Sequence, residues 1–290
     1  MNGQPTSPWE RWRHWALAPQ PGDQLQSWLE AGALDPFPEL RALVGVPQDP
    51  TWHPEGEVWI HTRLVCDQAA EIAIRDRLDE TARLELLFGA LCHDLGKPAT
   101  TCLRNGRWSA PGHPAAGVEP TVRWLHAVGA PPSLIAVVRC LVAEHLAHVQ
   151  TDMGARALRR MLVRLRPASF EQLLRLIEAD LGGRPPLPRG LPTDVLTWST
   201  RAREQLAQGL PDPSPRGVSP LILGRHLIAL GHSPGVWFAE VLRECAAAQE
   251  AGEFTDEAEG LRFLQTLLHL RQRPTREEYV PPVDTRPSDR

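Results

Sequence analysis

The run His93-Asp94-Leu95-Gly96-Lys97 places two kinds of metal ligand side by side, next to the only lysine of the chain. The other 30 of its 31 basic residues are arginine. A compact, flexible ammonium differs physically from a planar guanidinium, so a solitary lysine indicates a position that needs the former. The alternative is a helix C-terminus that accepts any cation. The whole run is a stronger signal of a chemical site than the lysine alone.

A transition-metal centre needs several histidine and carboxylate ligands that converge from different parts of a fold, with one position open to water. His93 and Asp94 could provide two ligands at the end of one helix. His61 on the preceding antiparallel helix and Asp180 at the end of a later one would complete a set of four. Helical bundles build metal sites in this way, from side chains on facing helices.

Three further histidines form a second tier of candidates. His113 opens one predicted helix, and His145 and His148 lie three residues apart near the end of the next, on one face. They could hold a second ion or a phosphate, with Asp94 bridging. Each histidine taken alone is more often an ordinary surface or core side chain. We treat the other six in that way: His14, His53, His126, His226, His232 and His269.

The elements that must position these residues are predicted to be helical nearly throughout, because alternating strand patterns are almost absent. The sequence therefore predicts an all-α protein, a helical bundle with a C-terminal helical module. Helices are expected over residues 8–17, 24–31, 81–92, 132–148, 155–165 and 169–181. Two more are expected to begin at Glu57, for roughly five to six turns, and at His113. Asn105-Gly106 is a predicted tight turn. The expected divisions are an N-terminal extension (1–50), a metal-binding domain (51–185), a helical module (186–270) and a disordered tail (271–290).

Composition excludes several classes of protein. With 42% hydrophobic and 23% charged residues, the chain is typical of globular proteins. No apolar run approaches the ~20 residues that span a bilayer. No signal peptide is evident, and five cysteines without a CxxC pair indicate reduced thiols, so a cytoplasmic location is expected. Nothing in the sequence sets the oligomeric state.

Two surface stripes have competing interpretations. Trp9, Trp12 and Trp15 recur at three-residue spacing and are expected to be buried against the main body, with a docking surface as the alternative. The net charge of −4 argues against nonspecific coating of nucleic acid. Residues 151–190, however, carry eight arginines against four acidic residues. Candidate RNA-binding residues, or equally a solvated face, are Arg156, Arg159, Arg160 and Arg164.

The order His61, His93-Asp94, Asp180 resembles the signature of the HD superfamily of metal-dependent phosphohydrolases. A longer resemblance, over roughly residues 35–270, is to the HD domain and C-terminal body and tail of bacterial CCA-adding tRNA nucleotidyltransferases. The runs that carry it are 37–40, 46–50, 52–59, His61-Thr62, 90–97, Gly112-His113, 143–145, 178–180, 220–231, Pro234-Gly235 and 252–255.

This resemblance implies a phosphomonoesterase or phosphodiesterase that acts on nucleotides or RNA ends, such as 2′,3′-cyclic or 2′-phosphates, with tRNA as a further candidate partner. One or two ions of Mn, Fe, Co, Ni or Zn would be held by His61, His93, Asp94 and Asp180, and would lower the pKa of a bound water. Asp94, Lys97, His113 and His145 are the expected catalytic residues.

The sequence departs from the resemblance at its beginning. Only about 35 residues precede the matching region, and no Asp-x-Asp pair occurs, so nucleotidyl transfer is not expected of this sequence alone. Two alternatives to the hydrolase remain. One is a noncatalytic tRNA- or RNA-binding module, and the other, more distant, is a di-iron oxygenase of the HD type.

Overall fold

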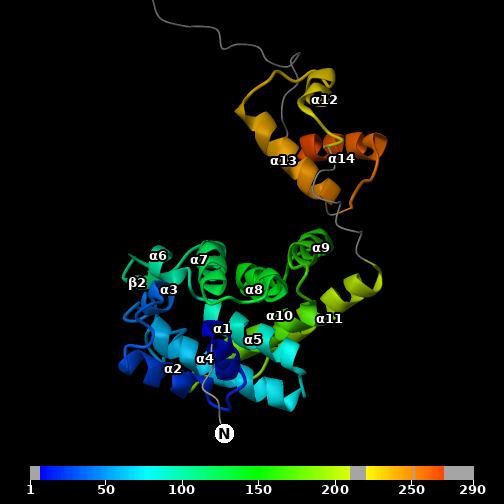
Figure 1. The fold of residues 1–290 in the computed structure, drawn as a ribbon. Helices are drawn as coiled ribbons and strands as arrows, with labels where there is room; N and C mark the ends of the chain where they lie inside the picture. Colours follow the sequence, from blue (N-terminus) through cyan, green and yellow to red (C-terminus); the bar gives the residue numbers. More distant parts are fainter. Residues whose placement is uncertain (1–6, 210–219, 251, 271–290) are drawn as a thin grey trace, which may run out of the picture. The chain divides into compact units, whose positions relative to one another are not determined.

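A computed structural model describes residues 7–209, 220–250 and 252–270 (Figure 1). Its contacts divide the chain into two compact units, Met1–Ala207 and Gln208–Arg290. The boundaries predicted at residues 50 and 185 both fall inside the first unit, and the sequence-based domain division stays a prediction. The tail predicted to be disordered, 271–290, lies outside the described residues.

The described residues are mainly helical, which confirms the all-α prediction. None of their helices is both long and apolar enough to cross a bilayer. The helices of the first unit are α1 (Pro8–Ala16), α2 (Pro21–Glu30), α3 (Pro38–Arg41), α4 (Val58–Arg75), α5 (Glu80–Cys92), α6 (Lys97–Thr100), α7 (His113–Ala127), α8 (Pro132–Glu144), the 3₁₀ turn Ala147–Gln150, α9 (Ala155–Arg164), α10 (Phe170–Gly182) and α11 (Thr193–Ala207).

Local signals explain where the helices that carry the site begin. Asp79 caps α5 by accepting a hydrogen bond from the backbone N–H of Ala82. Ser169 and Gln172 form a reciprocal capping box at the start of α10. Prolines lie in the first turns of α7 and α8. Backbone N–H groups in a first turn have no acceptor within the helix, so proline, which lacks the N–H, costs no hydrogen bond there.

One short hairpin interrupts the helical pattern. Strands β1 (Cys102–Arg104) and β2 (Arg107–Ser109) pair antiparallel, with Leu103 opposite Trp108. Asn105 and Gly106 both have positive φ, as a two-residue hairpin turn requires. The turn was predicted, whereas the strands were not, because three residues are too few to show an alternating pattern.

The core of the first unit lies where α4, α5, α8 and α10 pack together, with α7 against α8 and α2 against α4 (Figure 1). Burial of the tryptophan stripe is confirmed for Trp12 and Trp15, which are almost completely buried, whereas Trp9 is only partly buried. Trp9 stacks on Phe88 of α5, and Trp12 meets Trp124 of α7 edge to face. Helix α1 is therefore part of the core and packs against α5.

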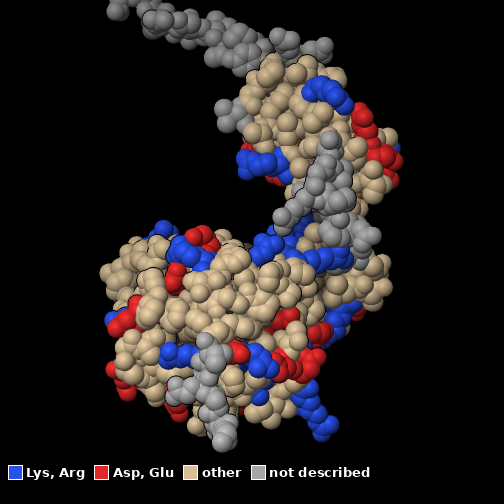
Figure 2. All heavy atoms as spheres, viewed as in Figure 1, with Lys and Arg blue, Asp and Glu red and all other residues tan. Residues whose placement is uncertain are grey.

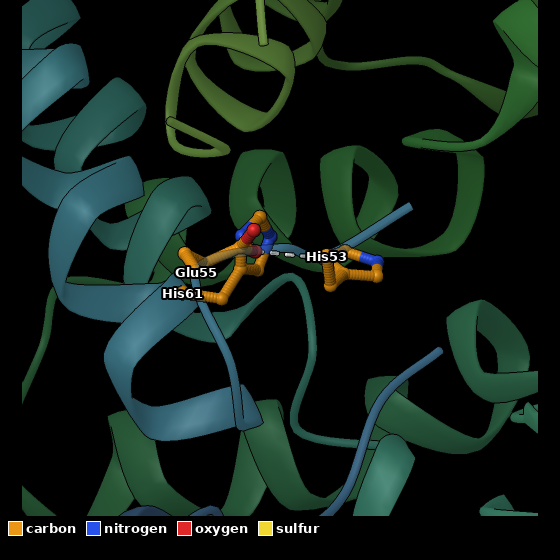
Figure 3. A group of neighbouring side chains, drawn as sticks. All are labelled: His53, Glu55 and His61. Carbon is orange, nitrogen blue, oxygen red and sulfur yellow. Dashed lines mark hydrogen bonds and ion pairs between the residues drawn. The ribbon is translucent and has the colours of Figure 1, made fainter. Parts of the chain in front are cut away.

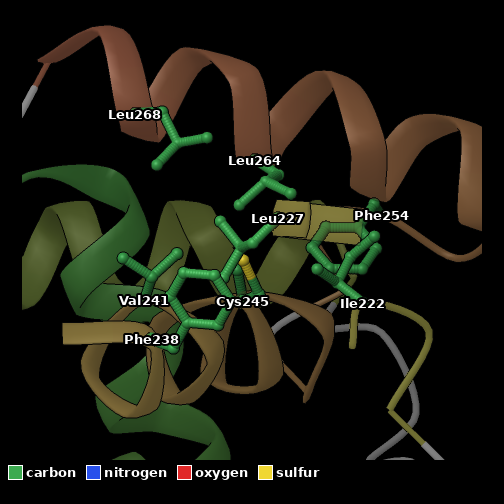
Figure 4. Packing of buried hydrophobic residues seen from close by; sticks show 9 residues of the cluster. Ile222, Leu227, Phe238, Val241, Cys245, Phe254, Leu264 and Leu268 are labelled. Atoms are coloured by element: carbon green, nitrogen blue, oxygen red, sulfur yellow. The ribbon is translucent and has the colours of Figure 1, made fainter. Parts of the chain in front are cut away.

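The second unit contains α12 (Gly224–Ala229), α13 (Val236–Glu250) and α14 (Glu257–Leu270). These helices enclose a core of their own (Figure 4), made of Ile222, Leu227, Phe238, Val241, Cys245, Ala248, Phe254, Leu264 and Leu268. A separate apolar core allows this module to be treated as its own structural unit.

Candidate metal centre

Six polar side chains from five helices or their ends converge inside the first unit. All are less than one-tenth exposed. Their positions are the first turn of α4 (His61), the end of α5 (His93 and Asp94), the first residue of α7 (His113), the residue after α8 (His145) and the last turn of α10 (Asp180). The structure thus brings together the predicted set of four and two histidines of the second tier.

The first group of ligand atoms surrounds Nε2 of His61. This nitrogen lies 3.3 Å from Nε2 of His93, 3.1 Å from Oδ1 of Asp180 and 3.8 Å from Oδ2 of Asp94. Nε2 of His93 lies 3.2 Å from the same Asp94 oxygen. Ligand atoms bonded to one ion at about 2.0–2.2 Å lie roughly 3.0–3.4 Å apart, so this spacing suits a shared cation.

A second group shares Asp94 with the first. Nε2 of His113 lies 3.3 Å from the other Asp94 oxygen, Oδ1, and 3.1 Å from Nε2 of His145. The ligand atoms of these three residues all lie within 4.8 Å of one another. Asp94 therefore presents one oxygen to each group, as a carboxylate between two ions does.

Three of the four histidines have Nδ1 hydrogen-bonded outside the centre, and that of His61 lies in ion-pair contact with a carboxylate. His93, His113 and His145 each have Nδ1 2.8 Å from a backbone carbonyl, that of Ala90, Ala110 and Val142 respectively. Nδ1 of His61 lies 2.7 Å from Oε1 of Glu55. A proton donated at Nδ1 leaves the lone pair on Nε2, which is how metal-binding imidazoles are oriented in proteins.

Asp94 supplies the clearest sign that a cation belongs here. Its side chain is 1% exposed. Oδ2 pairs with the Lys97 ammonium, but Oδ1 has no hydrogen-bond partner among the described residues. A buried carboxylate without hydrogen bonds is costly unless a positive charge compensates it. Lys97, whose Nζ lies 2.7 Å from Oδ2, is one such charge. The remaining surroundings are imidazole nitrogens with lone pairs, which fit a transition metal and repel one another without a cation.

The protonation equilibria agree with this arrangement. Although burial alone would raise it, the electrostatic interactions of Asp94 with His93 and Lys97 hold the pKa of its carboxyl group well below the usual range. Burial lowers the pKa of His145 to about 3, so its ring is neutral at neutral pH. Burial opposes a charge on His61 too, but its contacts with Asp180 and Glu55 raise its pKa overall. A proton shared by His61 and Asp180 would be displaced by a metal ion.

The turn that carries His93 and Asp94 depends on Gly96. A Cβ atom at this position would lie 2.1 Å from the carbonyl oxygen of His113 and 2.6 Å from the backbone nitrogen of Gly117. The backbone of this turn therefore packs directly against the first turn of α7. Such contact brings Asp94 within reach of His113, and no residue with a side chain could replace the glycine without moving α7.

The structure adds two residues that the sequence interpretation left out of the site. His53 and Glu55 precede α4, and Oε1 of Glu55 lies 2.8 Å from Nδ1 of His53 and 2.7 Å from Nδ1 of His61 (Figure 3). We treated His53 as an ordinary histidine. The run Trp52-His53-Pro54-Glu55-Gly56 carries two ligand-type residues immediately before a ligand-bearing helix, which was the available signal. Glu55 is a positioning residue, since it fixes the ring of His61.

Replacing Glu55 by alanine is expected to weaken metal binding without removing any ligand. Loss of a partner of this kind lowers metal affinity roughly 10- to 100-fold. Calorimetric titration of Co²⁺ into the metal-free protein measures the change. Glu71→Ala on α4, the helix that carries His61, removes an exposed carboxylate and serves as the control. An affinity in Glu55→Ala within twofold of the wild type would show that His61 is held by other means.

The remaining candidates lie outside the two ligand groups. Helix α8 ends at Glu144, earlier than predicted, so His148 lies in the 3₁₀ turn, where its Nδ1 donates to the His145 carbonyl, 3.1 Å away. On α9, Arg159 donates to Gln205 and Arg164 pairs with Glu144. Arg156 and Arg160 belong to the same helix, over which Lys and Arg atoms are visible at the surface in Figure 2. A role for these residues in phosphate or RNA binding stays a prediction.

Comparison with known proteins gives homology over part of the chain, although no protein-family model matches it. The Multifunctional CCA protein of Pasteurella multocida (strain Pm70) is 35% identical over 178 residues, which are 58% of this chain and 40% of that protein. The protein of the same name from Laribacter hongkongensis (strain HLHK9) is 34% identical over 187 residues, 62% and 44% of the two chains. That of Xanthomonas campestris pv. campestris (strain B100) is 32% identical over 225 residues, 72% and 52%. The chain therefore spans about half the length, or less, of these curated relatives, and it is homologous to Multifunctional CCA proteins over that part.

Proposed function

We propose that this protein is an HD-type metal-dependent phosphohydrolase that acts on phosphoesters of nucleotides or RNA ends. The observation that carries the proposal is the convergence of four buried imidazoles on a buried carboxylate, one oxygen of which, Oδ1, has no hydrogen-bond partner among the described residues. A noncatalytic binding module would have no need of so many desolvated ligand groups. Homology to Multifunctional CCA proteins favours a tRNA-related substrate.

The proposed chemistry divides between the ion and the chain. A divalent ion, when bound, supplies Lewis acidity for the phosphoryl group and lowers the pKa of water. Mixed histidine and carboxylate ligation suits Mn, Fe, Co, Ni or Zn. His61, His93, Asp94 and Asp180 would hold the first ion, and His113 and His145, with Asp94, a second.

Lys97 has the proposed role of neutralising negative charge beside the ligands. Its ammonium lies 2.7 Å from Oδ2 of Asp94 and 2.6 Å from Oε1 of Gln48. These two acceptors leave one of the three ammonium protons without a partner among the described residues. In the mechanism that we propose, this N–H donates to a phosphate oxygen as charge develops there.

Metal dependence of phosphate release tests the proposal. Purified protein treated with a chelator is expected to be inactive, and added Mn²⁺, Co²⁺ or Ni²⁺ should restore phosphate release from 2′-AMP or 2′,3′-cyclic AMP. Mg²⁺ should restore less, because it prefers oxygen ligands. A protein that stays silent with every metal across mono- and diester substrates would contradict the hydrolase.

The second candidate is a noncatalytic RNA-binding module, which the arginines of α9 and the homology favour. It predicts that the protein shifts tRNA in a gel whether or not a chelator is present. The di-iron oxygenase alternative predicts bound iron and oxygen consumption instead. The three functions are thus separated by phosphate release, tRNA retention and iron content.

A further inference from the structure

Arg184 lies beside the candidate metal centre and, unlike an ordinary surface arginine, is largely buried with few polar partners. Its side chain is 13% exposed, and its Nε atom is buried without a hydrogen-bond partner among the described residues. The one ion pair that it forms there is with Oδ1 of Asp180, at 3.9 Å. A guanidinium offers five N–H donors, and a buried Nε–H without an acceptor is costly.

Two glycines account for this position. A Cβ atom on Gly183 would lie 2.5 Å from Cγ2 and 2.9 Å from the backbone nitrogen of Val65, one turn after His61 on α4. On Gly182 it would lie 2.8 Å from Oε1 of Gln68. The end of α10 is therefore pressed directly onto α4. This close approach sets Arg184 next to Asp180 at the edge of the first ligand group.

The charges of the centre change sign when a metal binds. The centre contains three carboxylates, those of Asp94, Asp180 and Glu55. It contains two permanent cations, Lys97 and Arg184. Once the proton shared by His61 and Asp180 is displaced and the histidines are neutral, one negative charge remains. A single divalent ion turns this into one positive charge, and a second ion makes it three. With Asp180 bound to the ion, its charge would be compensated there, and Arg184 would need another anion as a partner.

We infer that Arg184 binds the phosphate group of the substrate, on the Asp180 side of the first ligand group. The inference rests on the proposed function for the identity of the substrate, a phosphoester, but not for the binding of an anion. A guanidinium matches two oxygens of one phosphate at once, which a single ammonium does not. Lys97 and Arg184 would then hold the phosphate between them.

Binding of inorganic phosphate to the Mn²⁺-loaded full chain tests this inference. Phosphate is titrated calorimetrically into wild type, Arg184→Gln, Arg184→Lys and the control Arg189→Gln, each freed of excess metal. Arg189 belongs to the same stretch of chain, but its side chain is exposed and pairs with Glu71. Arg184→Gln is expected to keep its manganese and to bind phosphate roughly 10- to 100-fold more weakly. Arg184→Lys should recover part of the loss, and Arg189→Gln should match the wild type.

Three results would overturn the inference. The first is a phosphate affinity of Arg184→Gln within twofold of the wild type. The second is loss of manganese along with phosphate in Arg184→Gln, which would mean that Arg184 only supports Asp180. The third is a wild type that binds no phosphate. Phosphate binding that depends on Arg184 in a protein that hydrolyses no phosphoester would refute the proposed function and leave this inference standing. Hydrolysis with an unchanged KM in Arg184→Gln would refute this inference and leave the proposed function standing.

Discussion

Replacing Asp94 by asparagine is expected to abolish metal-dependent activity, with a loss of roughly a thousandfold or more, because the variant removes the charge that both ligand groups share. Asparagine has nearly the same size, so the packing around a side chain that is 1% exposed should persist. Metal should also cease to stabilise the fold. At a concentration 100 times Kd, a ligand stabilises the wild type by about 2.7 kcal/mol, and this increment should vanish in the variant.

Asp79→Asn at the other end of the same helix is the matched control. Asp79 caps α5 through Oδ1, and asparagine caps helices equally well. Thermal unfolding with and without Co²⁺ should therefore show a metal-dependent rise in Tm for wild type and Asp79→Asn, and none for Asp94→Asn. A full rise in Asp94→Asn would mean that the stabilising ion binds elsewhere.

Among the substitutions proposed for this protein, replacing Gly96 by alanine should lower the free energy of unfolding most, by about 3 kcal/mol or more. The added Cβ would lie 2.1 Å from the carbonyl oxygen of His113, a backbone atom that cannot turn aside as a side chain can. Helix α7 must move, and His113 must then move away from Asp94. Urea unfolding gives the change in the free energy of unfolding, and calorimetry the number of Co²⁺ ions bound.

Gly89→Ala separates the effect of the contact from that of any glycine-to-alanine change. Gly89 lies in the middle of α5, and its added Cβ would meet only side-chain carbons of Leu141 and Leu176, at 3.4 Å and beyond. Alanine favours a helix over glycine by about 1 kcal/mol, so this variant should be as stable as wild type or more stable. Equal stabilities of the Gly96 and Gly89 variants would contradict the close backbone contact.

The convergence of His61, His93, Asp94 and Asp180 could be predicted because each lies near the end of a strongly periodic helix. Helix ends that pack antiparallel meet at one depth, so the residue types and the helix order were enough. Their role as ligands, and that of His113 and His145, stays a prediction. The all-α fold followed from the same periodicity and is confirmed.

Other parts of the site depend on contacts that periodicity does not encode. Glu55 and His53 lie in a loop, so helical periodicity could not show that they face His61. Arg184 follows Gly182-Gly183, which reads as a simple helix stop, although the two glycines permit a close approach to α4. The end of α8 at Glu144 was missed because its apolar pattern continues beyond that residue, and this separates His148 from the face of His145.

The metal content of the purified full-length chain tests the central claim most directly. The wild type, prepared without chelators and dialysed against Mn²⁺, Co²⁺ or Zn²⁺ followed by metal-free buffer, should retain one to two ions per chain by elemental analysis, and Asp94→Asn should retain essentially none. A wild type that retains no ion, or an Asp94→Asn variant that retains as many as the wild type, would contradict a metal centre built around Asp94.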